Sequence, residues 1–175
     1  MGITVLRLGH RPIRDKRVTT HLFLAARAFG ADRGIYSGVK DRGLEETLAR
    51  VCLEWGGSFR VEYAESWRKV VKEWSGKVVH LTMYGVPFRD VIPAIRDDSA
   101  EKLIIVGGEK VPSEAYSLAD WNVSVTSQPH SEVSALALFL HEYFEGQELD
   151  KEFDGARLRV VPQERGKKVV TITSP

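Results

Sequence analysis

The stretch from residue 103 to residue 140 decides the fold, and it reads LIIVGGEKVPSEAYSLADWNVSVTSQPHSEVSALALFL. It opens with an apolar run that ends at Gly107-Gly108. A second apolar run, residues 121–125, leads through a polar cluster to a helical pattern that begins at Glu132. Two strand exits with polar groups, one of them ending at a helix N-terminus, favour a polar ligand at the carboxyl edge of a parallel sheet. We therefore expect the functional site at this edge.

The rest of the chain alternates strand-like and helix-like segments in the same way. Apolar and β-branched runs predict strands at 3–8, 34–37, 59–63, 78–83, 103–106 and 121–125. Helical spacing predicts helices from a cap at Thr19 or Thr20 to Gly30, then at 41–55, 66–74, 88–95 and from 132 into the 140s. Residues 111–113 have the composition of a turn. The order predicts an α/β fold with a mainly parallel sheet and helices on both faces.

The composition changes after Gly146, where charged and polar residues dominate as far as Gly155. Two β-branched runs, 156–161 and 168–173, then flank a turn-like segment. We expect residues 1–146 to form the α/β domain and residues 147–175 to form a C-terminal β-hairpin extension, which is also locally basic.

The overall composition narrows the class of protein. The chain has 175 residues, 43% of them hydrophobic and 28% charged, with a formal net charge of +1, so a nucleic-acid partner would have to bind a local basic patch. The single cysteine excludes an internal disulfide framework, which favours a reduced, cytoplasmic setting. No stretch approaches the ~20 apolar residues of a membrane span, so we expect a soluble protein without a membrane partner. The histidines lack the spacing of a metal site, so we expect no metal.

Three features near the predicted edge could carry chemistry. The glycines after residue 106 would let backbone approach a ligand, although an ordinary strand-to-helix turn has the same composition. Residues 10–17 form a predicted loop with four Lys or Arg side chains, which could meet phosphates or could simply be solvated. His130 lies in the loop before the last helix and is the best functional candidate among the histidines. Neither a P-loop, nor GxGxxG, nor GxSxG occurs.

The last predicted helix is apolar on more than one side. Leu138 and Phe139 lie off its main apolar stripe. A helix that is apolar on several sides is buried on several sides, either in a subunit interface or beneath the C-terminal hairpin.

Several motifs resemble a known family. They read VLRLGHRPIRDKRVTTHLFLAARAFGA, HLTMYG, LIIVGGEKVPSEAYSLADWNVSV and TSQPHSEVSALALFL. Together they resemble the archaeal tRNA (cytidine-56)-2′-O-methyltransferases of the SPOUT, or knotted, methyltransferase superfamily, over residues 3–145. The resemblance implies a C-terminal trefoil knot, a homodimer, and S-adenosyl-L-methionine held by three loops, which here are residues 81–85, 107–111 and 122–132.

The resemblance also implies site residues. Related ribose methyltransferases carry a catalytic arginine where this chain has Leu24, so we expect Arg14 to serve instead, with Arg11 and Arg17 as rivals. Glu109 and Asn122 match the acidic and amide residues of the family's second and third motifs and complete the expected catalytic set. The expected cofactor-binding residues are Leu81, Gly107, Gly108, Glu109, Lys110, Val111, Val125, Thr126, Ser127, Gln128, Pro129, His130, Ser131 and Glu132. The expected RNA-binding residues are Arg11, Arg14 and Arg17.

The implied function is S-adenosylmethionine-dependent 2′-O-methylation of cytidine 56 in the TΨC loop of tRNA. Arginine is a poor base, so we expect Arg14 to orient the hydroxyl and stabilise the developing alkoxide; base catalysis by an arginine of lowered pKa is the alternative. Since nucleotide 56 is buried in the tRNA elbow, local opening of the RNA is expected. The alternatives are a ribose methyltransferase for another RNA, and an RNA- or nucleotide-binding module without catalysis.

Overall fold

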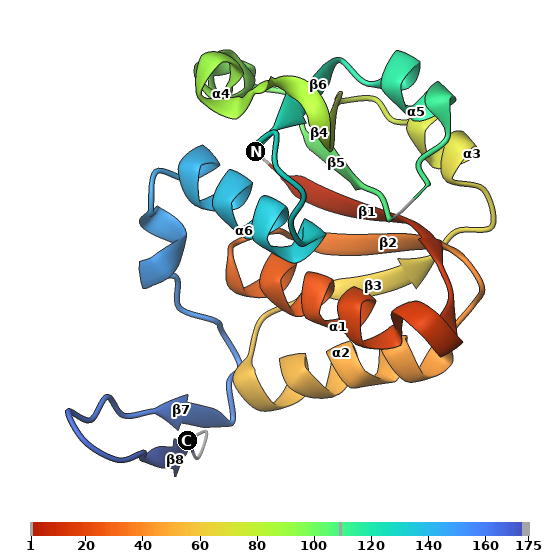
Figure 1. Ribbon diagram of the computed structural model, residues 1–175. Helices are drawn as coiled ribbons and strands as arrows, with labels where there is room; N and C mark the ends of the chain where they lie inside the picture. Colours follow the sequence, from red (N-terminus) through yellow and green to blue (C-terminus); the bar gives the residue numbers. More distant parts are fainter. Residues whose placement is uncertain (1, 109, 173–175) are drawn as a thin grey trace.

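The computed structural model describes residues 2–108 and 110–172. Six parallel strands form one sheet with helices on both faces (Figure 1). The strands are β1 (Ile3–His10), β2 (Arg33–Gly38), β3 (Arg60–Tyr63), β4 (Lys77–Pro87), β5 (Lys102–Val106) and β6 (Trp121–Ser124). The helices are α1 (Pro12–Ala28), α2 (Arg42–Trp55), α3 (Trp67–Lys72), α4 (Phe88–Asp97), α5 (Ser113–Leu118) and α6 (Glu132–Tyr143), followed by the 3₁₀ turn η1 (Gln147–Asp150). In this described part of the chain, no helix is both long and apolar enough to cross a lipid bilayer.

The strand order, β3-β2-β1-β5-β4-β6, places the change of winding direction between β1 and β5. On one side the chain steps outward from β1 to β3, and on the other side lie the three later strands. A crevice opens outside the carboxyl ends of the strands at such a switch point, and ligands of open α/β sheets bind there. The fold therefore puts the predicted edge at the position that this architecture reserves for ligands.

The two faces of the sheet follow from the alternation of side chains along each strand. On β1, Ile3 and Val5 belong to the core beneath α1, α2, α4 and α6, whereas Leu6 and Leu8 belong to the core beneath α3 and α5. All four of these side chains are 5% exposed or less. The two cores confirm the predicted α/β class, with a sheet that is fully parallel within the described residues.

The predicted start of the first helix is wrong. Helix α1 begins at Pro12, so most of the segment predicted as a cationic loop is its first turns. Proline suits the first helical position, because the amide hydrogen it lacks would have no helical partner there. Thr19 caps nothing: it is buried, and its Oγ1 lies 2.9 Å from Nδ1 of His10.

Three smaller differences lie around the last strands. The residues predicted as a turn lead into helix α5, which is too short to show a helical period. Strand β4 continues four residues beyond the predicted run. Helix α4 runs through Pro93 as predicted but ends later, at Asp97, and Ile92 and Ile95 on either side of the proline are buried in the core.

The C-terminal residues form the predicted β-hairpin. Strands β7 (Leu158–Val160) and β8 (Val169–Thr171) pair antiparallel, and Figure 1 shows them apart from the main sheet. The start of the hairpin contacts α2, since the amide of Arg157 donates to the carbonyl of Glu54 at 2.9 Å. The Arg27 guanidinium also lies 4.4 Å from the ring centre of Phe153. The division into domains at residue 146 stays a prediction.

Candidate functional site

A cavity of about 560 Å³ opens at the carboxyl edge of the sheet. Its floor is a row of register partners across four strands: Arg7 faces Val106, which faces Leu81, which faces Val123. All four side chains line the cavity. Beyond this row the chain leaves each of the four strands by a different segment, and residues of these segments form the walls.

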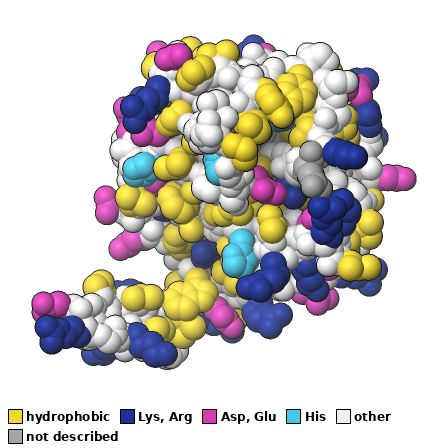
Figure 2. All heavy atoms as spheres, in the orientation of Figure 1, with side chains coloured by type: hydrophobic (Ala, Val, Ile, Leu, Met, Phe, Trp, Pro, Cys, Tyr) yellow, Lys and Arg dark blue, Asp and Glu magenta, His cyan; other side chains and the backbone are white. Residues whose placement is uncertain are grey.

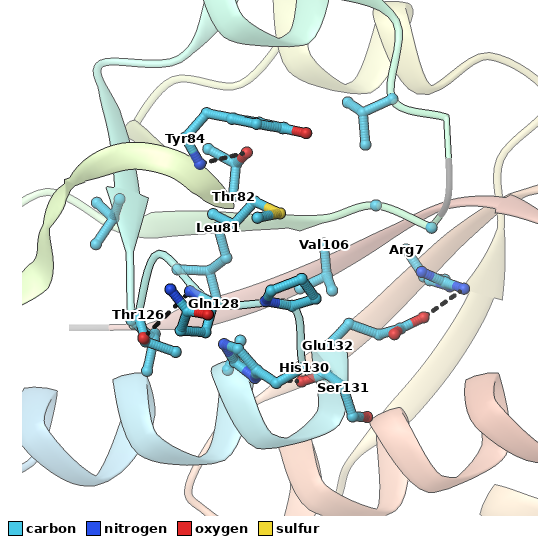
Figure 3. Close-up of a pocket in the computed structure, with 18 of the residues that line it drawn as sticks. Arg7, Leu81, Thr82, Tyr84, Val106, Thr126, Gln128, His130, Ser131 and Glu132 are labelled. Atoms are coloured by element: carbon cyan, nitrogen blue, oxygen red, sulfur yellow. Dashed lines mark hydrogen bonds and ion pairs between the residues drawn. The ribbon is translucent and has the colours of Figure 1, made fainter.

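Figure 3 shows lining residues that converge on the cavity from different parts of the chain. Leu81, Thr82 and Tyr84 come from the far end of β4, and Gln128, His130 and Glu132 come from the approach to α6. The remaining lining residues are Arg11, Arg14, Asp15, Met83, Gly107, Gly108, Val111, Tyr116, Val125, Thr126, Pro129, Ser131 and Ala135. The cavity thus combines apolar side chains with polar groups, as ligand pockets do.

Arg7 is the most unusual residue of the floor. It is only 2% exposed, and its Nη2 lies 3.0 Å from Oε1 of Glu132. Its Nε and Nη1 are buried with no hydrogen-bond partner in the described part of the chain. Burial lowers the pKa of the Arg7 guanidinium, while Glu132 opposes that shift. Arg7 therefore keeps unused hydrogen-bond donors at the bottom of the cavity.

The approach to α6 presents its backbone and short side chains to the cavity. Ser131 caps the helix, since its Oγ accepts from the amide of Val133 at 3.2 Å. Glu132 follows in the first turn, where a carboxylate interacts favourably with the helix dipole, and its side chain reaches Arg7 (Figure 3). The Thr126 hydroxyl accepts from the amide of Gln128 at 3.3 Å and shapes the loop before the helix.

The glycine turn after β5 is closely packed. A Cβ on Gly107 would lie 2.0 Å from Cγ2 of Val111, and one on Gly108 would lie 3.3 Å from Nη2 of Arg7. The first position therefore has no room for a side chain, because the turn folds back on itself. Both glycines line the cavity, and whether their backbone contacts a ligand there stays a prediction.

The start of α1 brings cations to the rim of the cavity. Arg11, Arg14 and Asp15 share one helix face, because residues three and four apart are neighbours on a helix. Nε of Arg11 lies 2.7 Å from Oδ2 of Asp15, and this bond holds the pKa of the Asp15 carboxyl below its ordinary value. Arg17 does not line the cavity. Figure 2 shows Lys and Arg side chains grouped at the right of this face, where Figure 1 places the start of α1.

A second buried cluster fixes this helix start. His10 is fully buried, and its ring nitrogens lie 2.9 Å from Oγ1 of Thr19 and 3.3 Å from Oδ2 of Asp41. Asp41 also caps α2, since its Oδ1 accepts from the amide of Leu44 at 3.2 Å. Burial acts to raise the pKa of Asp41, but its hydrogen bonds outweigh burial and hold that pKa below its ordinary value. The cluster joins β1, α1 and α2 and so sets the position of the rim arginines.

The Asn122 side chain lies behind the cavity wall. Its Oδ1 is 2.9 Å from Nδ1 of His80, and its Nδ2 donates to the carbonyl of Tyr116 at 2.9 Å. Because an amide oxygen only accepts, Nδ1 of His80 donates to Oδ1 of Asn122, and burial lowers the pKa of the His80 imidazole. Asn122 thus holds Tyr116, which lines the cavity, against β4 and β6.

The structure brings most of the predicted site residues together. Those that line the cavity are Arg11, Arg14, Leu81, Gly107, Gly108, Val111, Val125, Thr126, Gln128, Pro129, His130, Ser131 and Glu132. Lys110 lines a neighbouring cavity, while Ser127 and Asn122 line neither. Glu109 lies outside the described residues. The roles assigned to all of these residues stay predictions.

The sequence prediction missed Arg7, Asp15 and Tyr116. For Arg7 a signal was present, because a cation inside an apolar strand is almost never fully buried unless it is paired. Thr82 and Tyr84 lie within the predicted loop after Leu81 but were not singled out. Leu24 packs against the core.

Comparisons with known proteins agree with this geometry. The family model described as "tRNA ribose 2'-O-methyltransferase, aTrm56" matches residues 55–170. A tRNA (cytidine(56)-2'-O)-methyltransferase of Methanothermobacter thermautotrophicus is 55% identical over 170 residues, which cover 95% of each chain. That of Thermococcus kodakarensis is 53% identical over 175 residues, which cover 97% of each chain.

Solved structures show the same fold at low sequence identity. The A. aeolicus TrmH/SpoU tRNA modifying enzyme superposes with a TM-score of 0.61 at 14% identity, covering 85% of this chain and 76% of that one. The SpoU methyltransferase AviRb from Streptomyces viridochromogenes, in complex with AdoMet, gives a TM-score of 0.59 at 14% identity, with 83% and 57% covered. The resemblance seen in the sequence is confirmed, and the chain belongs to the aTrm56 family of tRNA ribose 2′-O-methyltransferases.

Proposed function

We propose that this protein transfers a methyl group from S-adenosylmethionine to the ribose 2′-hydroxyl of cytidine 56 in tRNA. The observation that carries the proposal is the cavity of about 560 Å³ at the switch point, with arginines on its floor and rim, in a chain of this family. Relatives that carry this activity in their names align along nearly the whole chain.

The described residues fit the methyl donor. Val106, Val111 and Val125 offer apolar walls for an adenine ring, and the backbone of the glycine turn offers hydrogen-bonding groups beside them. Gly107 carries no side chain, and a Cβ there would clash with Val111, so the backbone of this turn can approach a ligand closely. When bound, S-adenosylmethionine supplies a methyl group on a sulfonium, which departs as a thioether.

The transfer forms a carbon–oxygen bond and breaks a carbon–sulfur bond and the hydroxyl O–H bond. The ribose 2′-oxygen bonds to the methyl carbon, the carbon–sulfur bond breaks with its electron pair moving to sulfur, and the hydroxyl proton passes to solvent. The products are a 2′-O-methyl ribose and S-adenosylhomocysteine. Since the sulfonium leaves readily, the protein must chiefly position and polarise the hydroxyl.

Arg14 is placed to do this from the rim. An arginine guanidinium offers hydrogen-bond donors and no acceptor, so the proposed role of Arg14 is to donate hydrogen bonds to the hydroxyl. The planar fork of an arginine suits a hydroxyl and a neighbouring phosphate together, and its charge stabilises an alkoxide that forms between them. Arg11 lies on the same helix face, where it supports the binding of the RNA backbone.

We also propose that the protein forms a homodimer. A homodimer is supported by α6, where Leu138 is 49% exposed although Phe139 beside it is fully buried within the chain. We also propose a trefoil knot and a cytoplasmic location, both of which the family resemblance supports. We further propose that the hairpin contacts RNA, which its basic residues support. Light scattering tests the dimer, which should have twice the chain mass of 19.7 kDa.

Two measurements test the proposed function. Calorimetric titration with S-adenosylmethionine should show binding, with heat that disappears when S-adenosylhomocysteine already fills the site. Incubation with an unmodified tRNA transcript, followed by mapping of every 2′-O-methyl group, should find methylation at position 56. A protein that binds no S-adenosylmethionine, or that methylates a different position, would overturn the proposal.

A further inference from the structure

A second cavity adjoins the first on the other side of Arg7. Its volume is about 540 Å³, within the range of ligand pockets. The two cavities share five lining residues: Arg7, Arg11, Arg14, Asp15 and Gly108. A ligand in the second cavity would therefore lie against the same arginines as a ligand in the first.

The floor of this cavity is built by the ends of β1 and β2. Ser37 is buried, and its Oγ accepts from the amide of Gly9 at 3.3 Å. Gly38 has φ of +110°, and a Cβ there would lie 2.4 Å from the carbonyl oxygen of His10. No side chain fits at Gly38, so the two strand ends stay close and the space above them stays open.

Arg7 supplies the observation that points to a ligand. The side chain is buried, lines both cavities, and has no described partner for Nε and Nη1. Native structures rarely leave buried donors without a partner, and a ligand is one explanation when they do. Its one ion pair, with Glu132, lies on the side of the first cavity, because Glu132 lines only that one.

The outer wall of the second cavity carries a carboxylate, an ammonium and an indole. Glu65 and Lys110 are exposed, whereas Trp67 is only 8% exposed and contributes an apolar edge. This combination matches the edge of cytosine. A carboxylate accepts from the N4 amino group, which uracil replaces with a carbonyl oxygen, and an ammonium donates to the ring acceptors or to a flanking phosphate.

We propose that the second cavity receives the target nucleotide, and that Glu65 selects cytosine over uracil by accepting from its amino group. This inference rests on the proposed methyl transfer and adds a base-reading pocket to it. Lys110 and the rim arginines hold the nucleotide's phosphate, while the ribose lies at the boundary between the cavities, beside Arg14.

The test compares two tRNA transcripts, one with cytidine and one with uridine at position 56. Values of kcat/KM are measured for the wild type, for Glu65→Gln, and for the control Glu62→Gln, whose exposed side chain lines neither cavity. Any effect of the base on RNA folding cancels when enzymes are compared on the same transcript pair. S-adenosylmethionine affinity is measured for each protein alongside.

We expect the wild type and Glu62→Gln to prefer cytidine by the same factor. Glu65→Gln should lower that preference about tenfold, because a neutral amide both accepts from the amino group and donates to the uracil oxygen. Its S-adenosylmethionine affinity should not change. An unaltered preference in Glu65→Gln, or a wild type that treats both bases alike, would overturn the inference. A wild type that methylates neither transcript would instead overturn the proposed function.

Discussion

Two buried polar side chains stand three residues apart on β1 and have opposite surroundings. His10 has a partner for each ring nitrogen, Thr19 on one side and Asp41 on the other. Arg7 has one ion pair, to Glu132, and two guanidinium nitrogens without a described partner. A buried donor left unpaired costs about 1–3 kcal/mol, so the fold carries a cost at Arg7 that it avoids at His10.

This difference in hydrogen-bond partners indicates that His10 belongs to the scaffold and Arg7 to the ligand site. The His10 cluster is satisfied within the chain, and its effect is to hold α1 and α2 against the sheet. The Arg7 donors that have no described partner are expected to gain one when a ligand enters the cavity. Substitutions in the first cluster should therefore alter stability, while substitutions around the second should alter binding and transfer.

The largest effect is expected at Arg14, which the His10 cluster positions at the rim. Arg14→Lys keeps the charge but loses the fork of donors, so the single-turnover rate of methyl transfer should fall about 100-fold. The unfolding midpoint and the S-adenosylmethionine affinity should stay as in the wild type. Arg42→Lys, at an exposed position away from both cavities, is the matched control. Wild-type transfer by Arg14→Lys would remove Arg14 from the mechanism.

Arg7→Lys tests directly whether Arg7 belongs to the ligand site or, like His10, to the scaffold. Lysine can still face Glu132 but offers fewer and differently placed donors, so kcat/KM should fall on the order of tenfold or more. Arg33→Lys, at an exposed position on β2, controls for loss of an arginine from the sheet. If the variant lost stability yet kept kcat/KM, Arg7 would belong with the scaffold.

Alanine substitutions at Gly107 and Gly108 should lower the affinity for S-adenosylmethionine to different extents. Gly107→Ala places a methyl group against Val111 and must shift the turn, so S-adenosylmethionine affinity should fall about tenfold. Gly108→Ala meets only the flexible end of Arg7 and should cost less. Titration calorimetry on both proteins measures the difference. Equal affinities for the two variants would show that the turn does not contact the cofactor.

Asp41→Ala should give the smallest effect, and one confined to stability. It removes a helix cap and a partner of His10, which lowers the free energy of unfolding by about 1–2 kcal/mol at pH 7. The pKa of Asp41 is held below its ordinary value, so its charged form contributes stability above about pH 4, and this contribution is lost as the pH falls through its folded pKa. Urea unfolding at pH 7 and pH 3 should show the difference from wild type shrinking. A difference of the same size at both pH values would contradict this role.

The strands were predictable because their apolar and β-branched runs are local signals. The same is true of the glycine turn and of the loop before Glu132, whose residues do meet in the cavity. The start of α1 was not predictable from periodicity, because its first turns are exposed and cationic and carry no apolar stripe. Its true signal was Pro12, which suits a first helical position.

The importance of Arg7 depends on distant parts of the chain. Its burial requires β5 on one side and the start of α6 above it, and its partner Glu132 lies 125 positions later in the sequence. Only the register of four strands brings Arg7, Val106, Leu81 and Val123 into one row. A cation in an apolar strand was visible in the sequence, but the cavity beside it was not.

The most direct test of the proposed 2′-O-methylation uses two tRNA transcripts that differ by one oxygen atom. One carries cytidine at position 56 and the other carries 2′-deoxycytidine there. With labelled S-adenosylmethionine, the first should take up one methyl group per molecule and the second none. Equal labelling of both transcripts would show that the protein does not methylate the 2′-hydroxyl of nucleotide 56, and would contradict the account given for this site.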